Sequence, residues 1–177
     1  EIYNALKFRC PMGVELVYEA SDEDIVIEGD KNRIFQVVSN LIGNAFKFTT
    51  NGSVSYGYRR KGNEIEFHVS DTGIGIEAGK LDKVFERFVK MNSFAQGTGL
   101  GLSICKTIIE RLGGTISASS EMGKGTTFTF TLPEKQEETA DKHADIHKSG
   151  VNAPTYAQKE NNASFSGEEH QGSEHAP

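Results

Sequence analysis

Apolar side chains recur at helical spacing in two long stretches of the chain. From Ile34 to Phe46 they stand three and four residues apart, which predicts an amphipathic helix, and Asp30 before them is a suitable N-cap. The same spacing predicts a second helix over residues 99–112, which two consecutive glycines end. Shorter helices are expected at residues 1–8 and 81–88.

Other segments alternate apolar and polar residues or are rich in β-branched and aromatic residues, which is typical of strands. They come in pairs joined by short polar or glycine-containing turns. Three hairpins are therefore expected, formed by residues 14–19 with 25–28, 53–60 with 64–71, and 115–120 with 126–132.

The pattern of a globular core ends at Pro133. The remaining residues, 134–177, contain only four scattered large apolar or aromatic side chains, so their burial cannot offset the entropy of ordering the chain. We therefore expect a disordered tail. His143 and His147 stand four residues apart in this tail, but a solvated pair is favoured over a metal site in so polar a segment.

Charge and cysteine content narrow the classes of function. The tail carries nine acidic residues and four lysines, so the net charge of −6 leaves about −1 for residues 1–133. A nearly neutral domain argues against a nucleic-acid surface, where a basic face would be expected. Cys10 and Cys105 have no metal-ligand or disulfide-framework spacing, and reduced thiols in the cytoplasm are expected. No apolar run approaches the roughly 18 residues of a membrane span, so no direct membrane contact is expected.

The first predicted helix carries a polar group of candidate ligands in the segment NLIGNAFKF. Asn40 and Asn44 are four residues apart and project from one face, with Lys47 near that face one turn on. Amide oxygens can serve as the one or two protein ligands that Mg²⁺ takes beside phosphate oxygens and water, and the lysine would neutralise phosphate charge. The alternative is a solvated polar face of the helix.

Two glycine-rich segments follow. In DTGIGI, Asp71 ends a predicted strand, and its carboxylate could accept a hydrogen bond from the exocyclic amine of adenine while Gly73 and Gly75 allow close approach. A plain turn is the alternative. The segment GTGLGLSI runs into the second helix, whose N-terminus favours anions. It matches neither the GxxxxGK[ST] loop nor the dinucleotide fingerprint.

Taken together, QVVSNLIGNAFKFT, DTGIGI, VFERF and GTGLGLSI resemble the N, G1, F and G2 boxes of the catalytic ATP-binding domain of sensor histidine kinases. These belong to the superfamily of gyrase, heat-shock chaperones, histidine kinases and MutL. The resemblance covers about residues 13–133. It implies a two-layer α/β sandwich of the Bergerat type, with a mixed sheet of about five strands backed by about three helices.

The resemblance, together with the composition of the tail, implies a domain organisation. Residues 1–12 would be the end of a linker or dimerisation helix, residues 13–133 the catalytic domain, and residues 134–177 an acidic tail.

The resemblance assigns roles by position. Asn44, helped by Asn40, would bind Mg²⁺, while Lys47 and Arg87 would reach phosphate. Phe48 would pack on adenine, and Phe85 and Phe88 would anchor the segment that leads to the lid, although plain core aromatics are an equal reading. The remaining residues expected to bind ATP, or to shape its site, are Asp71, Gly73, Gly75, Gly97, Thr98, Gly99, Leu100, Gly101 and Thr126.

One position separates the branches of the superfamily. Members that hydrolyse ATP carry a glutamate as general base four residues before the magnesium-binding asparagine, and here that position is Asn40. An amide has no useful basicity near neutral pH, so phosphoryl transfer is favoured over hydrolysis. The implied activity is that of a protein-histidine kinase.

The implied phosphate acceptor is a histidine on a separate dimerisation domain absent from this chain, with onward transfer to a response regulator. His68 lies within a predicted strand and does not fit that role. A cytoplasmic location is implied, with attachment of the parent protein to the inner membrane left open. Two alternatives remain, an anti-sigma-type serine kinase of the same fold and a nucleotide-sensing module without transfer activity.

Overall fold

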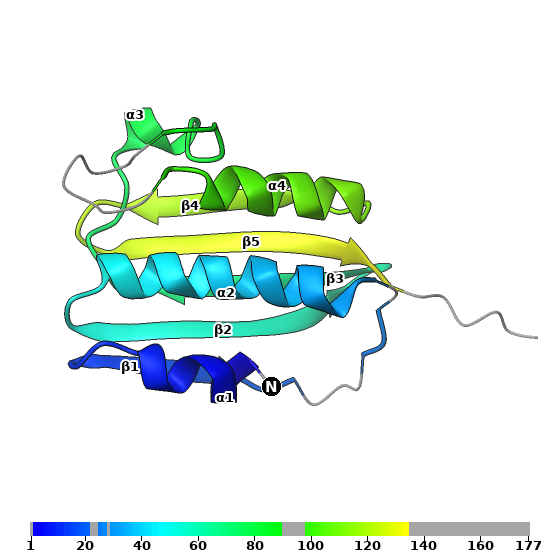
Figure 1. Cartoon of the computed structure of the whole chain (residues 1–177), viewed down its shortest axis with the longest axis horizontal. Helices are drawn as coiled ribbons and strands as arrows, with labels where there is room; N and C mark the ends of the chain where they lie inside the picture. Colours follow the sequence, from blue (N-terminus) through cyan, green and yellow to red (C-terminus); the bar gives the residue numbers. More distant parts are fainter. Residues whose placement is uncertain (1, 22–24, 28, 90–97, 135–177) are drawn as a thin grey trace, which may run out of the picture. The chain divides into compact units, whose positions relative to one another are not determined.

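A five-stranded mixed sheet forms the framework of the domain. The computed structural model describes residues 2–21, 25–27, 29–89 and 98–134. The strands are β1 (Val14–Glu19), β2 (Gly52–Lys61), β3 (Glu64–Asp71), β4 (Ile116–Glu121) and β5 (Gly125–Pro133), arranged in the order β1-β2-β3-β5-β4 (Figure 1). This confirms the predicted class, a mixed sheet backed by helices.

Two of the three predicted hairpins are present. β2 pairs with β3, and β4 with β5, both antiparallel, as the turns between them predicted. The hairpin of residues 14–19 with 25–28 is wrong, because β1 pairs in parallel with β2. In the described part of the second segment, Ile27 forms an isolated bridge with Glu134. A parallel pair needs a long crossover, and α2 supplies it here.

Helices α1 (Ile2–Leu6), α2 (Lys31–Phe48) and α4 (Gly101–Arg111) lie against one face of the sheet, and α3 (Ala78–Leu81) lies beside β4 (Figure 1). A 3-10 turn, η1 (Lys7–Arg9), follows α1. Asp30 is the N-cap of α2 and accepts hydrogen bonds from the backbone N–H groups of Asn32 and Arg33 at 2.8 and 3.2 Å, as predicted. The position of the short helix predicted at 81–88 is wrong: α3 ends at Leu81, and residues 82–88 form turns.

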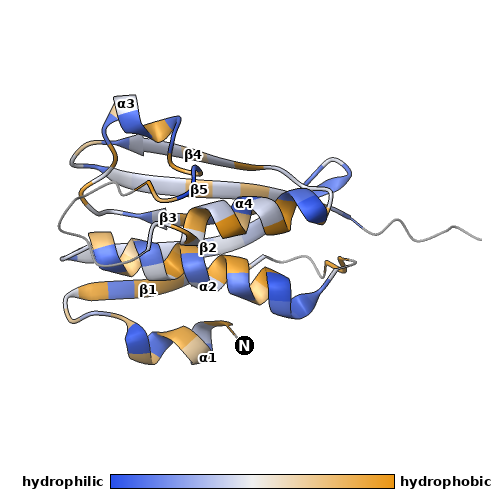
Figure 2. Ribbon diagram, turned by 45° about the horizontal axis from the view of Figure 1, so that its top comes forward, coloured by the Kyte–Doolittle hydropathy of each residue, from blue (hydrophilic) through white to orange (hydrophobic). Residues whose placement is uncertain are grey.

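The core lies between this helical layer and the sheet. The apolar stripes of α2 and α4 face the sheet while their polar sides face outward (Figure 2). Phe130 on β5 is fully buried, and its ring stacks on that of Phe67 on β3 at a centroid distance of 4.7 Å. Val37, Leu41 and Ile42 of α2 are also fully buried, so the helix that carries the polar residues is anchored through its apolar side.

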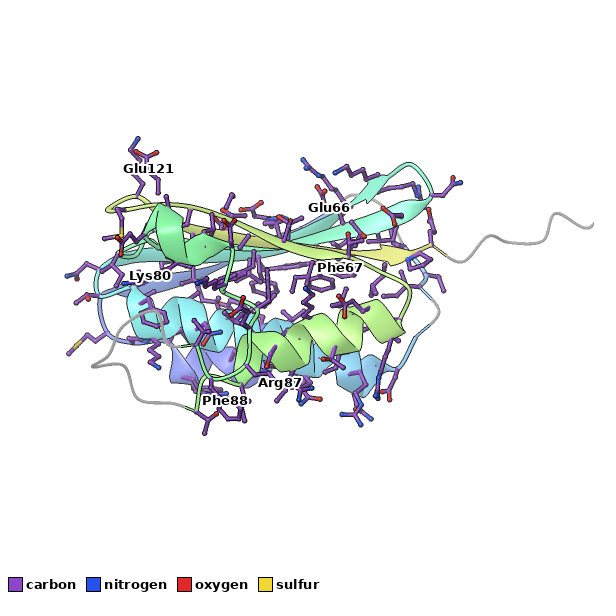
Figure 3. All side chains as sticks on the ribbon, turned by 90° about the horizontal axis from the view of Figure 1, so that it is seen from above. Glu66, Phe67, Lys80, Arg87, Phe88 and Glu121 are labelled. Atoms are coloured by element: carbon purple, nitrogen blue, oxygen red, sulfur yellow. The ribbon has the colours of Figure 1, made fainter. Side chains whose placement is uncertain are left out.

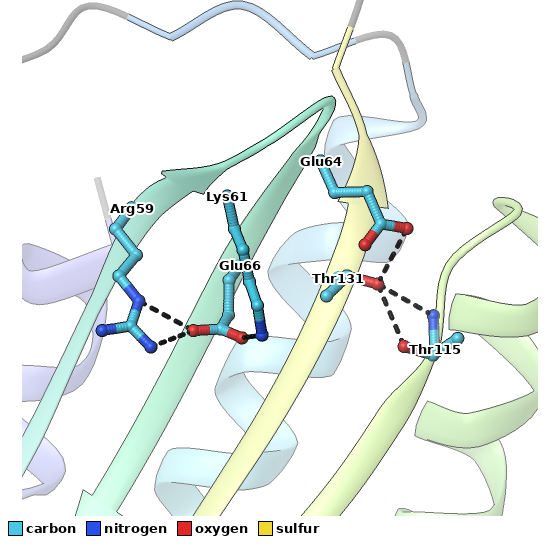
Figure 4. Close-up of polar contacts among 6 residues, drawn as sticks. All are labelled: Arg59, Lys61, Glu64, Glu66, Thr115 and Thr131. Atoms are coloured by element: carbon cyan, nitrogen blue, oxygen red, sulfur yellow. Dashed lines mark hydrogen bonds and ion pairs between the residues drawn. The ribbon is translucent and has the colours of Figure 1, made fainter.

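The other face of the sheet is polar. Glu66 and Phe67 are neighbours on β3 and point to opposite faces, Phe67 toward the helices and Glu66 away from them (Figure 3). Arg59 and Lys61 both pair with the Glu66 carboxylate, the latter at 2.6 Å (Figure 4). The hydrogen bond from Lys61 and, to a smaller extent, that from Arg59 lower the pKa of Glu66 below its usual value. Every described helix thus leaves this face uncovered.

The described residues belong to one compact unit, Glu1–Glu138. The expected tail, with His143 and His147, lies outside the described residues, apart from Glu134. The domain limits at 12 and 133 therefore stay predictions.

The central position of Phe130 yields a test of this packing. Phe130→Ala should lower the free energy of unfolding by about 3–5 kcal/mol, because it removes a buried ring and leaves a cavity. Phe8→Ala is the matched control, since Phe8 is 85% exposed, and should change it by no more than about 0.5 kcal/mol. Urea unfolding of both variants measures the difference. Equal effects would contradict the described core.

Candidate nucleotide-binding site

The candidate site begins on the exposed side of α2. Asn40 and Asn44 are half-buried and border the buried side of α2 that includes Val37, whereas Lys47 is exposed. The Lys47 ammonium lies 5.3 Å from the centroid of the Phe48 ring. This arrangement sets two amides and a cation in line along one helix face, as the spacing predicted.

Asp71 lies at the end of β3, where the strand leaves the sheet. It is 7% exposed, and its carboxylate Oδ1 accepts a hydrogen bond from the Gly73 N–H at 2.9 Å. Burial raises the pKa of Asp71 above its usual value, although backbone hydrogen bonds from Gly73 and Thr126 oppose the shift. A buried carboxyl group with few protein donors is suited to accept a hydrogen bond from a ligand amine.

The loop after Asp71 is wedged between two other stretches of backbone. A Cβ at Gly73 would lie 2.8 Å from the Phe48 carbonyl carbon, and one at Gly75 would lie 2.7 Å from the Glu121 carbonyl carbon. Both are closer than real Cβ contacts, so the two positions require glycine. The Ile74 N–H donates to the Phe48 carbonyl at 3.2 Å, which ties the loop to the end of α2.

Two hydroxyl groups on β4 and β5 support this loop from the other side. Thr126, predicted from the resemblance, is 6% exposed and pairs with Asp71 across the strands. Ser120 was not predicted. Its Oγ lies 3.0 Å from the Thr126 Oγ1 and accepts a hydrogen bond from the Ile76 N–H at 2.8 Å. The signal was available, since Ser120 stands opposite Thr126 in the β4–β5 hairpin.

The first turn of α4 faces α2. Leu100 occupies the N-cap position and makes no side-chain capping bond, so the first N–H groups of the helix lack a side-chain acceptor there. A Cβ at Gly101 would lie 3.8 Å from the Asn40 Oδ1, so the Asn40 amide faces this turn. The positive end of the α4 dipole and a neutral amide oxygen therefore adjoin one space.

Cys105, one turn further along α4, is a second residue that the sequence did not single out for the site. It is 0% exposed, and its Sγ–H donates to the Val37 carbonyl oxygen at 3.9 Å. Burial raises the pKa of this thiol to about 11, so it is protonated at neutral pH.

The segment between α3 and α4 is tied at its ends. The Phe88 N–H donates to the Gly99 carbonyl at 3.0 Å, and Phe88 has a φ of +65°, which is rare for a residue with a side chain. Phe85 packs edge-on against Phe128 at 6.1 Å, so it is a core aromatic, whereas Phe88 is 72% exposed and is not. Arg87 is exposed. Gly97 and residues 90–96 of the expected lid, which spans 89–96, lie outside the described residues, while Thr98 is exposed.

Taken together, the predicted motifs are linked in space. Phe48 of the first motif contacts the loop of the second, Asn40 faces Gly101 of the last, and Phe88 bonds Gly99. Asp71 pairs with Thr126. The arrangement combines a buried acceptor, a helix N-terminus without a side-chain cap and a lysine on α2, which is suited to a ligand with an amine-bearing ring and an anionic tail.

Comparison with known proteins identifies this arrangement. Residues 29–136 match the model of the histidine kinase-, DNA gyrase B- and HSP90-like ATPase family. The chain belongs to this family. It is therefore an ATP-binding domain, and its fold and motifs are those of the histidine kinase branch.

Relatives with sequence similarity are sensor kinases. The chain is 41% identical over 137 residues to the autoinducer 2 sensor kinase/phosphatase LuxQ of Vibrio parahaemolyticus, covering 71% of this chain and 16% of that protein. It is 39% identical over 135 residues to the sensor histidine kinase WalK of Bacillus subtilis, covering 72% and 22%. The chain thus spans about a fifth or less of the length of the relatives it matches.

Solved structures show the same fold. The full-length kinase ShkA in complex with AMPPNP matches with a TM-score of 0.70 at 30% identity, over 77% of this chain and 29% of that one. The catalytic domain of the histidine kinase ThkA matches with a TM-score of 0.67 at 32% identity, over 75% and 88%. Among the helices that the structure describes, none combines the length and the apolar content of a membrane span.

The wedged loop can be tested with a pair of glycine substitutions. Gly73→Ala places a methyl group against the Phe48 carbonyl and the Asp71 carboxylate, so it should destabilise the domain by about 1–3 kcal/mol and weaken nucleotide binding by displacing the loop. Gly79→Ala in α3 is the control, because a Cβ there meets nothing within 4 Å. This control should leave the stability of the domain and its affinity for nucleotide nearly unchanged. Thermal unfolding and calorimetric titration with ADP measure the two effects. Equal stability and equal ADP affinity of the two variants would contradict the close packing of the loop at Gly73.

Proposed function

We propose that this chain is the catalytic domain of a sensor histidine kinase and transfers the ATP γ-phosphate to a histidine on a dimerisation domain. The observation that carries the proposal is Asn40, an amide that faces the first turn of α4 where hydrolytic relatives carry a glutamate. With no carboxylate at that position to activate water, transfer to a nucleophile supplied by another domain is the favoured reaction.

The remaining residues take the roles that the resemblance implies, and the surroundings of those that the structure describes support these roles. Asp71 accepts a hydrogen bond from the adenine amine, and Gly73, Gly75 and Thr126 shape the adenine end of the site. Gly97, Thr98, Gly99, Leu100 and Gly101 bring backbone N–H groups to the phosphates at the start of α4. Phe48 contacts the base, and Lys47 and Arg87 neutralise phosphate charge.

Magnesium fits the donor set. Within residues 2–134 as far as the structure describes them, no group of three histidine, cysteine or acidic residues could hold a metal ion without help. Mg²⁺ is commonly bound by one or two protein oxygens together with phosphates, and the Asn40 amide oxygen beside Gly101 is a neutral ligand of that kind. Asn44 and Asn40 would hold the ion, which neutralises charge on the phosphates when bound.

The proposed partners are another domain of the parent protein and a response regulator. We infer a histidine-bearing dimerisation domain in the same parent chain and a response regulator as the next acceptor, since the relatives are named as sensor kinases. A nearly neutral catalytic domain supports the absence of a nucleic-acid partner. ATP as the phosphate donor supports a cytoplasmic location.

A chimera tests the transfer reaction. Residues 13–134 replace the matching segment of WalK, and the purified chimera is incubated with ATP labelled in the γ-phosphate and Mg²⁺. We expect labelled protein whose phosphate is lost in acid and retained in alkali, as for phosphohistidine, and no label after Asp71→Asn. Acid-stable label would favour a serine kinase instead. Nucleotide binding without any label, beside an active WalK control, would favour a sensing module and contradict the proposal.

The charge of Asp71 provides a separate test of the adenine site. Folding raises the pKa of Asp71, so the charged form is disfavoured in the nucleotide-free protein, and stability falls as the pH rises through the usual carboxyl range. Asp71→Asn keeps an acceptor for the Gly73 N–H without the charge. At neutral pH the nucleotide-free variant should therefore melt at or slightly above the wild-type temperature.

With Mg-ATP bound, the wild type should melt at a higher temperature than Asp71→Asn. Mg-ATP at 100 times its dissociation constant stabilises the wild type by about 2.7 kcal/mol, a rise of several degrees, and this rise should be absent in Asp71→Asn. Glu15→Gln, at an exposed position of β1, is the control and should keep the full rise. An unchanged rise in Asp71→Asn would contradict the assignment of the adenine site.

A further inference from the structure

Three polar side chains form a row across the strands where β3 ends. Asp71 on β3 stands directly opposite Thr126 on β5, and Thr126 stands directly opposite Ser120 on β4. Residues directly opposite each other in antiparallel strands point their side chains to the same face of the sheet. Phe128 and Phe130 follow Thr126 at intervals of two residues and are buried in the core. The row therefore lies on the face that the helices cover.

Two hydrogen bonds to backbone groups determine what Ser120 has left to offer. Its Oγ donates to the Gly125 carbonyl at 2.8 Å and accepts from the Ile76 N–H at 2.8 Å. A serine hydroxyl has one hydrogen and two lone pairs. The hydrogen is used on Gly125, because a carbonyl oxygen can only accept. One lone pair is used on Ile76, because an N–H can only donate.

The direction of the hydrogen bond between Ser120 and Thr126 follows from this count. The Ser120 Oγ and the Thr126 Oγ1 are 3.0 Å apart, and Thr126 is 6% exposed. Since Ser120 has only a lone pair left, the Thr126 hydroxyl must donate to it. The hydrogen of Thr126 then points toward β4, and its oxygen offers only lone pairs to a group that binds on the side of Asp71.

This direction matters for which base the site can hold. The ionised carboxylate of Asp71 can only accept hydrogen bonds, so Asp71 and Thr126 form a pair of neighbouring acceptors. The amino group at position 6 of adenine has two hydrogens and complements such a pair. A base with a carbonyl oxygen at that position would place a further acceptor against them, and a buried acceptor without a donor is costly.

We propose that Ser120 is a positioning residue for base selectivity: it fixes the Thr126 hydroxyl as an acceptor, so that the site takes a purine with an amino group at position 6 and rejects one with a carbonyl oxygen there. The proposal rests on the proposed function, because it needs a nucleotide base beside Asp71 and Thr126. Ser120 acts through Thr126 and not through contact with the ligand. Its bond to the Ile76 N–H also ties the loop after Asp71 to β4.

The expected effect is a loss of discrimination between ADP and IDP, whose bases differ in carrying an amino group or an oxygen at position 6. In Ser120→Ala the Thr126 hydroxyl loses its acceptor on β4 and can rotate to donate to the oxygen of IDP. The ratio of ADP affinity to IDP affinity should fall about 10-fold, the effect of one mismatched hydrogen bond.

Two further substitutions at the same position keep the test independent of folding. Ser120→Cys keeps the size of the side chain but supplies only a weak acceptor, so it should also lower the ratio if the alanine variant unfolds. Ser120→Thr should retain most of the wild-type ratio, because its hydroxyl group can make the same three hydrogen bonds.

Thr126 and two control positions complete the experiment. Thr126→Val keeps the shape of the side chain without the hydroxyl and should lower the ratio to a similar extent. Combined with Ser120→Ala it should lower the ratio no further, since the two act through one contact. Ser119→Ala is the matched control on β4, because Ser119 is exposed and points to the other face of the sheet. Ile76→Val is the control for a loosened loop, since Ile76 packs against the core, and it should weaken both nucleotides alike.

Isothermal titration calorimetry with ADP and with IDP, both in Mg²⁺, measures all variants. A wild-type ratio in both Ser120→Ala and Ser120→Cys would overturn the positioning role, and so would an equal fall in Ser119→Ala or Ile76→Val. A double variant in which the two single effects multiply would also contradict it. Failure of the proposed function itself is distinguished by the wild type, which would then bind ADP no more tightly than IDP or bind neither.

Discussion

The rest of the site depends on the close packing of the backbone after Asp71. This loop is held between the carbonyl group at the end of α2 and the carbonyl group of Glu121 at the end of β4, with no room for a Cβ at Gly73 or Gly75. This close packing brings together the end of α2, the end of the central strand β3 and the β4–β5 hairpin at the edge of the sheet. It also fixes where the Asp71 carboxylate lies relative to α2, and thereby the separation between the two ends of the ligand site.

Several groups at this site cost stability in the absence of a ligand. Asp71 is a buried carboxyl group whose charged form is disfavoured, α4 begins without a side-chain cap, and Phe88 adopts a left-handed backbone conformation. The first two can be offset by a ligand that supplies an amine donor and phosphate oxygens. The stable part of the fold, the stacked Phe67 and Phe130 and the buried side of α2, lies beneath these groups and holds them in place.

The sequence predicted the elements whose contacts are local. The apolar spacing and N-cap of α2 and the turns of the β2–β3 and β4–β5 hairpins are encoded within a few residues. The parallel pairing of β1 with β2 was missed, because it joins strands separated by the whole of α2. Ser120 and Cys105 were missed for a related reason. The pairing of Ser120 with Thr126 could have been read from the predicted hairpin, but the contacts of Ser120 with Ile76 and of Cys105 with Val37 join elements that no spacing along the chain relates.

The central claim is that one nucleotide spans from Asp71 to the start of α4. A crystal structure of this chain with Mg²⁺ and AMPPNP tests it most directly. The account predicts the adenine amine within hydrogen-bond distance of the Asp71 carboxylate, the phosphates at the N–H groups of Leu100 and Gly101, and the Asn40 and Asn44 amide oxygens toward the metal. A nucleotide bound elsewhere, or bound here with its base away from Asp71, would contradict it.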